Sequence, residues 1–158
     1  MRILGIDPGL QVTGYGVIDT SSATVQLVEA GVIRTDVKGS MAQRLNEIGA
    51  ALDEIVGEFN PEVVAIEELY SHYSHPKTAI IMGHARGVVF LKAAQNGLSV
   101  YPYAATRVKK SLLGHGRATK RQMQLMIRSA LGLSKTPEPP DAADALAVAI
   151  CHLHSARL

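Results

Sequence analysis

The chain has 158 residues, of which 47% are hydrophobic and 19% charged, a composition typical of a folded globular domain rather than a disordered chain. This length predicts one domain over residues 1–158 and excludes a large multidomain machine. Trp is absent and aromatic residues account for 4%, so we expect an aliphatic core. The formal net charge of +2 is too small to indicate a nucleic-acid partner by itself.

The charge is distributed unevenly along the chain. Residues 1–100 contain seven basic and eleven acidic side chains, whereas residues 101–158 contain nine basic and three acidic ones. No acidic residue interrupts one basic cluster in the second part, formed by Arg107, Lys109, Lys110, Arg117, Lys120, Arg121 and Arg128. Such a cluster can follow a phosphate backbone, and a solvated helix face is an equally good interpretation of the charge alone.

The cysteine content and the first residues indicate the compartment. The single cysteine, Cys151, excludes an intramolecular disulfide, and we expect it to be a small buried apolar residue. No apolar signal region follows Met1, and no run reaches the 18 apolar residues of a membrane span. We therefore expect a cytoplasmic protein that has no membrane partner.

Three strands are predicted at the start of the chain. Residues 3–6 and 14–18 are apolar runs on either side of a turn-rich interval, which is typical of an antiparallel hairpin, and a third strand is expected at 24–33. Ser40 then has the spacing of a capping box with Gln43, and an apolar stripe predicts a helix that continues to residue 59.

The middle of the chain is predicted to form a buried strand and a helix. Residues 63–66 are a continuous apolar run, typical of a strand buried on both faces, and Glu67 follows it directly. A helix is expected over 77–96, with Gly97 as its C-terminal cap. Three small residues share one side of this helix, which favours close packing within the chain over a subunit contact: Ala79, Gly83 and Gly87.

The rest of the chain is predicted to contain a strand at 99–103 and helices at 106–113, 119–131 and 141–154. We expect His152 and His154 to do no more than interact favourably with the C-terminal end of the last helix. Five strands with these intervening helices predict an α/β fold, with a mixed five-stranded sheet and helices on both of its faces.

Four carboxylates stand in unusual places. Asp7 and Glu67 each follow an apolar strand, and Asp141 and Asp144 lie one turn apart in an otherwise apolar helix. Asp7 alone could stabilise a turn and Asp141 alone could cap the helix, but an unpaired buried carboxylate is costly. Together the four would form an oxygen-donor site suited to Mg²⁺ or Mn²⁺. In phosphodiester hydrolysis, paired ions of this kind activate a water molecule and stabilise the leaving oxygen.

Five motifs give a specific resemblance that spans nearly the whole chain. They are Ile3-Leu4-Gly5-Ile6-Asp7-Pro8-Gly9, Thr13-Gly14-Tyr15-Gly16, Ala65-Ile66-Glu67, Ala85-Arg86-Gly87 and Asp141-Ala142-Ala143-Asp144-Ala145. In this order and spacing, the sequence resembles the RuvC family of bacterial Holliday junction resolvases. The resemblance implies a ribonuclease H-like fold and a homodimer that makes paired incisions across a four-way DNA junction in recombination and repair. It also implies two Mg²⁺ ions per subunit, replaceable by Mn²⁺, and a partnership with the RuvA-RuvB branch-migration complex.

The resemblance also assigns roles to particular residues. Asp7, Glu67, Asp141 and Asp144 stand at the family's catalytic, metal-binding acidic positions, and the match selects Glu67 over its neighbour Glu68. Lys109 and Lys120 match basic positions near the scissile phosphate, where Lys120 would either stabilise transition-state charge or clamp a phosphate. Tyr70 matches an aromatic position that would stack on a base of the opened junction. The remaining candidate DNA contacts come from the basic cluster: Arg107, Lys110, Arg117 and Arg121.

Three other functions share some of these sequence features. A different ribonuclease H-like nuclease could act on RNA or on another branched nucleic acid. A junction-binding module without cleavage is disfavoured because all four acidic residues are present. An actin-like ATPase could also use the Asp7-Pro8-Gly9 turn, but 158 residues leave no room for its second lobe.

Overall fold

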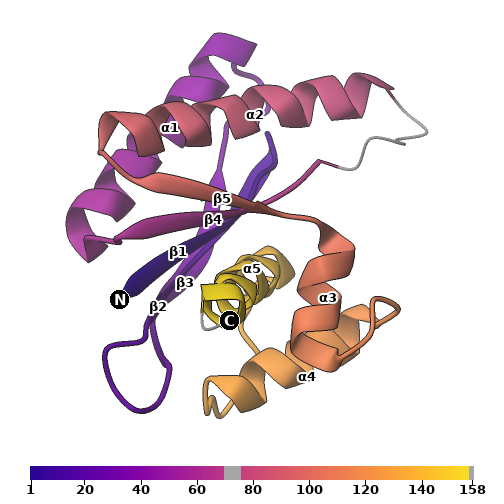
Figure 1. The fold of residues 1–158 in the computed structure, drawn as a ribbon. Coiled ribbons are helices and arrows are strands. Elements are labelled where there is room, and N and C mark those ends of the chain that lie inside the picture. Colours follow the sequence, from indigo (N-terminus) through magenta and orange to yellow (C-terminus); the bar gives the residue numbers. More distant parts are fainter. Residues whose placement is uncertain (70–75, 157–158) are drawn as a thin grey trace.

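A mixed sheet of five strands in the order β3-β2-β1-β4-β5 forms the centre of the computed structural model, which describes residues 1–69 and 76–156 (Figure 1). β1 pairs antiparallel with β2 and parallel with β4, β2 pairs antiparallel with β3, and β4 pairs parallel with β5. The strands are β1 (Arg2–Asp7), β2 (Val12–Asp19), β3 (Gln26–Arg34), β4 (Val63–Glu67) and β5 (Ser99–Tyr103). The mixed five-stranded sheet expected from the sequence is confirmed.

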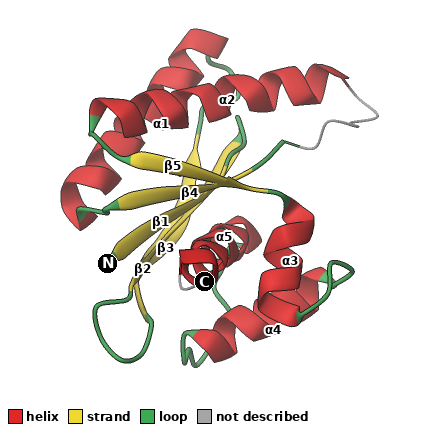
Figure 2. Ribbon diagram, in the orientation of Figure 1, coloured by secondary structure: helices red, strands yellow, loops and turns green. Residues whose placement is uncertain are grey.

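In the described part of the chain, five helices cover the two faces of this sheet, as predicted. They are α1 (Met41–Phe59), α2 (Pro76–Gln95), α3 (Ala105–Leu113), α4 (Lys120–Ala130) and α5 (Pro140–Ala156). Figure 2 shows α1 and α2 on one side of the strands and α5 on the other, with α3 and α4 beside α5. The predicted capping box of α1 is present, α4 begins with a further one at Thr119, and Gly97 follows α2 with a φ of +69°. Among the described residues, no helix is long and apolar enough to cross a membrane.

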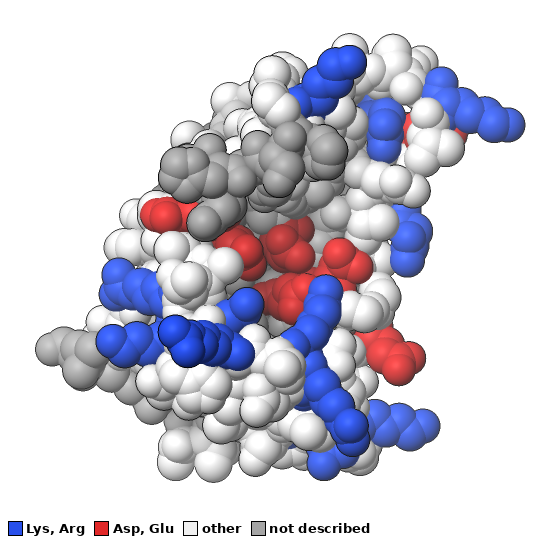
Figure 3. All heavy atoms as spheres, turned by 90° about the vertical axis from the view of Figure 1, so that its right-hand side faces the viewer, with Lys and Arg blue, Asp and Glu red and all other residues white. Residues whose placement is uncertain are grey.

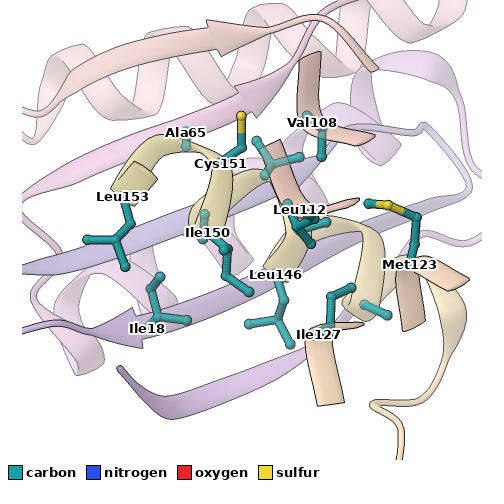
Figure 4. Close-up of a cluster of buried hydrophobic side chains, with 14 of the residues drawn as sticks. Ile18, Ala65, Val108, Leu112, Met123, Ile127, Leu146, Ile150, Cys151 and Leu153 are labelled. Atoms are coloured by element: carbon teal, nitrogen blue, oxygen red, sulfur yellow. The ribbon is translucent and has the colours of Figure 1, made fainter. Parts of the chain in front are cut away.

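The core is aliphatic and lies in two layers, one on each face of the sheet. Alternate residues of β1 and β4 point to opposite faces, so Leu4 and Ile66 pack toward α1 and α2. Ile3 and Ala65 pack toward α5 and the helices beside it. Figure 4 shows Ala65 in this layer, with side chains of α5 such as Leu146 and Ile150. Cys151 is fully buried in this second layer, as expected.

Helix α5 is the most deeply buried helix of the described chain. Eleven of its residues between Ala142 and Leu153 are buried. It lies unusually close to the sheet because β1 and β2 present glycines beneath it. A Cβ atom on Gly5 would overlap the carbonyl oxygen of Ala145, and one on Gly14 would overlap that of Asp141. These two glycines therefore set the distance between α5 and the strands.

Two expectations about particular residues are wrong. A Cβ atom on Gly87 would meet nothing within 4 Å, and one on Gly83 would meet only the far end of Leu69, so this side of α2 does not pack closely within the described chain. His152 does not simply face the C-terminal end of α5 either. It is buried and shares a hydrogen bond with Tyr103, because α5 presents it to β5 rather than to solvent.

Candidate active site

The strand register brings two of the predicted acidic residues together. Ile6 pairs with Ile66 in the parallel β1–β4 ladder, so Asp7 and Glu67 follow side by side at the carboxyl ends of the two strands. Asp7 lies four residues after Ile3 and Glu67 lies two residues after Ala65, so each points to the same face of the sheet as that residue. Ile3 and Ala65 pack toward α5. Both carboxylates therefore belong to the face of the sheet that α5 covers.

Helix α5 supplies the other two acidic residues from its N-terminal end. Asp141 lies in the first turn of this helix, and Asp144 follows one turn later on the same face. Because Gly14 of β2 lacks a side chain, the backbone of Asp141 rests directly on the strand next to β1. The close approach of α5 to the sheet thus brings its aspartates toward the end of β1, where Asp7 lies.

The acidic groups are close enough to influence one another's ionisation. Burial, followed by the charges of Glu67, Asp144 and Asp141, raises the pKa of Asp7 to about 7. Burial also raises the pKa of Glu67, with a further contribution from Asp144. Such carboxylates hold protons more readily than exposed ones, because their charges are poorly solvated and repel one another. A set of this kind favours a cation that offsets its negative charge.

Two lysines face the acidic group. Lys120 Nζ lies 3.0 Å from Asp144 Oδ2, and this ion pair raises the pKa of Lys120. The positive charge of Lys109 partly offsets the effect of burial, which raises the pKa of Glu67. These two lysines, Glu67 and Asp144 line one open cleft of about 230 Å³, together with Ala105, Val108, Met123 and Ala147.

Figure 3 shows how charge is arranged on this side of the molecule. Acidic side chains gather in a hollow at the centre of the face, and Lys and Arg side chains lie below and beside them. The fold therefore places acidic and basic side chains next to each other on this face. A phosphate chain crossing this face would meet cationic side chains around a strongly acidic centre.

The acidic residues do not yet surround a single point. Within residues 1–69 and 76–156, no group of three Asp, Glu, His or Cys side chains has a geometry that could hold one metal ion. Carboxylates of like charge repel one another, and Lys120 pairs with Asp144. The donor chemistry fits a hard divalent cation, and the side chains must draw together for three of them to reach it.

The other predicted contacts are placed less centrally. Lys110, Arg117 and Arg121 are exposed on α3, on the loop after it and at the start of α4. Arg107 lies away from the cleft, where its guanidinium donates to Ser155 Oγ at 3.2 Å and lies over the Tyr103 ring. Tyr70 lies outside the described residues.

Sequence reasoning missed part of the site's surroundings. The apolar wall of the cleft comes from Ala105, Val108 and Met123, whose spacing on amphipathic helices was a usable signal. It also missed the buried contact between Tyr103 and His152, which join β5 to α5 across 49 residues of sequence. No local pattern could have identified that pair.

Comparison with known proteins gives a consistent result. A family model described as crossover junction endodeoxyribonuclease RuvC matches residues 3–152. A protein of that name from Rhodopirellula baltica is 48% identical over 149 residues, which cover 94% of this chain and 84% of the relative. The match includes both strand ends and the part of α5 that carry the four acidic residues.

Solved structures agree with the sequence matches. The Thermus thermophilus RuvC structure has a TM-score of 0.90 and 38% identity, covering 99% of this chain and 96% of that one. A second Thermus thermophilus RuvC structure, in complex with a Holliday junction substrate, has the same TM-score and coverage and 35% identity. The expected ribonuclease H-like nuclease fold is thereby confirmed, and the chain belongs to the RuvC family of crossover junction endodeoxyribonucleases.

Proposed function

We propose that this protein resolves four-way DNA junctions by metal-dependent phosphodiester hydrolysis, with Asp7, Glu67, Asp141 and Asp144 as its metal-holding residues. One observation carries the proposal: carboxylates from β1, β4 and α5 converge beside a cleft that Lys109 and Lys120 also line. The related Thermus thermophilus protein in complex with a Holliday junction substrate supports the choice of DNA.

The acidic set suits Mg²⁺, with Mn²⁺ as a substitute, and we propose two ions in each subunit. When bound, such ions activate water and offset the charge that develops on the phosphate oxygens. Adjacent parallel strands would fix the backbones of Asp7 and Glu67, and a buried helix those of Asp141 and Asp144, so that only side-chain rotation is needed to bring the donors together. Rigid elements of this kind keep the backbones of donor residues in a fixed geometry.

The basic residues would hold the DNA backbone. The Lys120 side chain is 63% exposed although it pairs with Asp144. Its ammonium group is therefore already in contact with solvent and can swing from Asp144 to a DNA phosphate. Lys109 lines the same cleft and would contact a phosphate next to the cleaved one. Exposed cations farther out would bind flanking phosphates: Arg107, Lys110, Arg117 and Arg121. For Tyr70 the proposed base stacking follows from family resemblance alone.

A homodimer would let two such sites cut two strands. Helix α2 offers a surface for it, because Ile80, His84, Gly87 and Leu91 are all exposed and recur at intervals of three or four residues. Ile80 and Leu91 are 62% and 55% exposed, which is unusual for large apolar side chains on a helix. Gly87 lies between them and would allow a second backbone to approach closely. The partnership with the RuvA-RuvB complex follows from family resemblance alone.

The decisive experiment compares a labelled four-way junction with a linear duplex, each incubated with Mg²⁺ or with a chelator. We expect symmetric nicks in the junction alone and only when Mg²⁺ is present, over a panel of junction sequences. Asp7→Asn should keep junction binding and lose cleavage, because it removes one ligand charge and keeps the shape. Cleavage in the presence of chelator would contradict the proposed metal centre, and equal cleavage of the duplex would contradict junction selectivity.

A further inference from the structure

A buried polar contact joins the edge of the sheet to the core helix. The Tyr103 hydroxyl and His152 Nδ1 share a hydrogen bond of 2.8 Å, and both side chains are 6% exposed. The rings meet edge to face, with centroids 5.8 Å apart. Burial lowers the pKa of His152 and raises that of Tyr103, so both groups are uncharged near neutral pH. The contact is therefore a neutral hydrogen bond inside the core.

Tyr103 lies where two parts of the candidate site meet. It is the register partner of Glu67 at the end of the β4–β5 ladder. Its carbonyl oxygen accepts a hydrogen bond of 2.9 Å from the backbone N–H of Glu68, directly after Glu67. Helix α3, which carries Lys109, begins only two residues later at Ala105. The backbone of Tyr103 thus supports Glu67 on one side and starts the lysine-bearing helix on the other.

His152 belongs to the same helix as the two aspartates. It lies eight residues beyond Asp144, about 12 Å along the axis of α5. The hydrogen bond to Tyr103 therefore connects the helix that carries Asp141 and Asp144 with the strand that supports Glu67. Without it, the end of β5 and α5 would be joined at this point by apolar packing, which tolerates sliding better than a directional bond does.

We propose that Tyr103 and His152 are positioning residues that fix Glu67 relative to Asp144, so that the acidic residues can close around a divalent cation. This inference rests on the proposed metal centre. Stability alone explains the pair poorly, because replacing a buried neutral hydrogen bond by matched apolar groups is often close to neutral in free energy. A directional contact between two elements that both carry site residues has a clear use in setting geometry.

The test measures metal binding and cleavage separately in three variants. Tyr103→Phe removes only the hydroxyl, His152→Asn keeps an amide near the position of Nδ1 that can donate or accept a hydrogen bond, and Tyr101→Phe is the control. Tyr101 also packs on the His152 ring, with centroids 4.6 Å apart, but it is 42% exposed. Mn²⁺ binding to the full chain without DNA is followed by calorimetry, and junction cleavage is followed as a function of Mg²⁺ concentration.

We expect Tyr103→Phe to weaken Mn²⁺ binding and to raise the Mg²⁺ concentration for half-maximal cleavage by about 3- to 10-fold, with junction binding unchanged. The effect should be smaller than the roughly 10- to 100-fold typical of residues that contact a metal ligand directly. His152→Asn should lie close to the wild type, as should Tyr101→Phe. Unchanged metal dependence in Tyr103→Phe, with or without a lower melting temperature, would overturn the inference. Failure of the wild-type protein to bind Mn²⁺ would overturn the metal centre itself and this inference with it.

Discussion

Lys120 and Asp144 form an ion pair of 3.0 Å inside the candidate site, between the start of α4 and the start of α5. The lysine thereby holds one of the carboxylates that we assign to a divalent cation. A metal ion and the Lys120 ammonium group would compete for Asp144. Binding of the metal would release Lys120, which could then contact a DNA phosphate.

This competition predicts opposite effects of Lys120→Ala on two measurements. Metal binding without DNA should become tighter, because Asp144 loses its competing cation. Junction cleavage should become slower, and the slope of log binding constant against log salt should fall by about one charge. Lys38→Ala, an exposed lysine before α1, is the matched control. Weaker metal binding in Lys120→Ala would show that the lysine helps to assemble the site instead.

The elevated pKa of Asp7 predicts that replacing this residue stabilises the protein, and that the gain increases with pH. The folded protein releases this proton at a pKa of about 7 and the unfolded chain near 3.8, so the folded state binds more protons between these values. The contribution of Asp7 to the free energy of unfolding therefore falls as the pH rises through this window. In EDTA, Asp7→Asn should melt several degrees above the wild type at about pH 8, and the difference should disappear near pH 4. Glu54→Gln, which removes an exposed charge on α1, should show no such trend.

Adjacent glutamates offer a matched pair for testing cleavage. Glu67 lines the cleft, whereas Glu68 is exposed beyond the end of β4. We expect Glu67→Gln to reduce single-turnover cleavage at least about 100-fold, which corresponds to roughly 2.7 kcal/mol of transition-state stabilisation. Glu68→Gln should cleave within about twofold of the wild type. Equal losses in both variants would mean that the negative charge at the end of the strand matters, and not the position of one carboxylate.

Substitution of Gly14 tests the close approach of α5 to the sheet, and substitution of Gly57 is the control. A Cβ atom on Gly14 would overlap the carbonyl oxygen of Asp141, so Gly14→Ala should destabilise the fold by about 1–3 kcal/mol and reduce cleavage. Gly57 lies in α1 with open space around it, and Gly57→Ala should stabilise the fold by about 0.5–1 kcal/mol. Urea unfolding curves measure both. A stable but inactive Gly14→Ala protein would separate the effect on the site from the effect on the core.

The exposed face of α2 predicts the oligomeric state. Ile80→Glu places a charge in the proposed contact between subunits, so we expect self-association to weaken at least about tenfold in sedimentation experiments. Cleavage should change from paired incisions to single nicks. Val37→Glu alters another exposed apolar residue, on the loop before α1, and should leave the dimer intact. A monomeric wild-type protein would contradict the dimer directly.

Local patterns in the sequence were sufficient for much of the fold and of the acidic site. An apolar run predicts the β4 strand, and its alternation determines which face Glu67 shares with Ala65. The apolar sequence around Asp144 predicts a buried helix in which a carboxylate is unexpected. These inferences succeed because each depends on neighbours within a few residues.

Contacts between distant residues could not be predicted in the same way. The residue spacing on α2 shows that Gly83 and Gly87 share a side, but it does not tell whether the same chain or a second copy covers that side. His152 has the same difficulty, because a histidine near a helix end has no local feature that distinguishes an exposed ring from one bonded to Tyr103. Tertiary geometry determines both cases.

The burial of α5 has a consequence for how the protein opens. Amide hydrogens of a helix surrounded by core exchange with solvent mainly when the whole domain unfolds, whereas those of exposed segments exchange through local opening. The backbone behind Asp144 should thus be among the slowest to exchange. Asp144 would then keep its place until global unfolding, and moderate denaturant would inactivate the enzyme only as it melts.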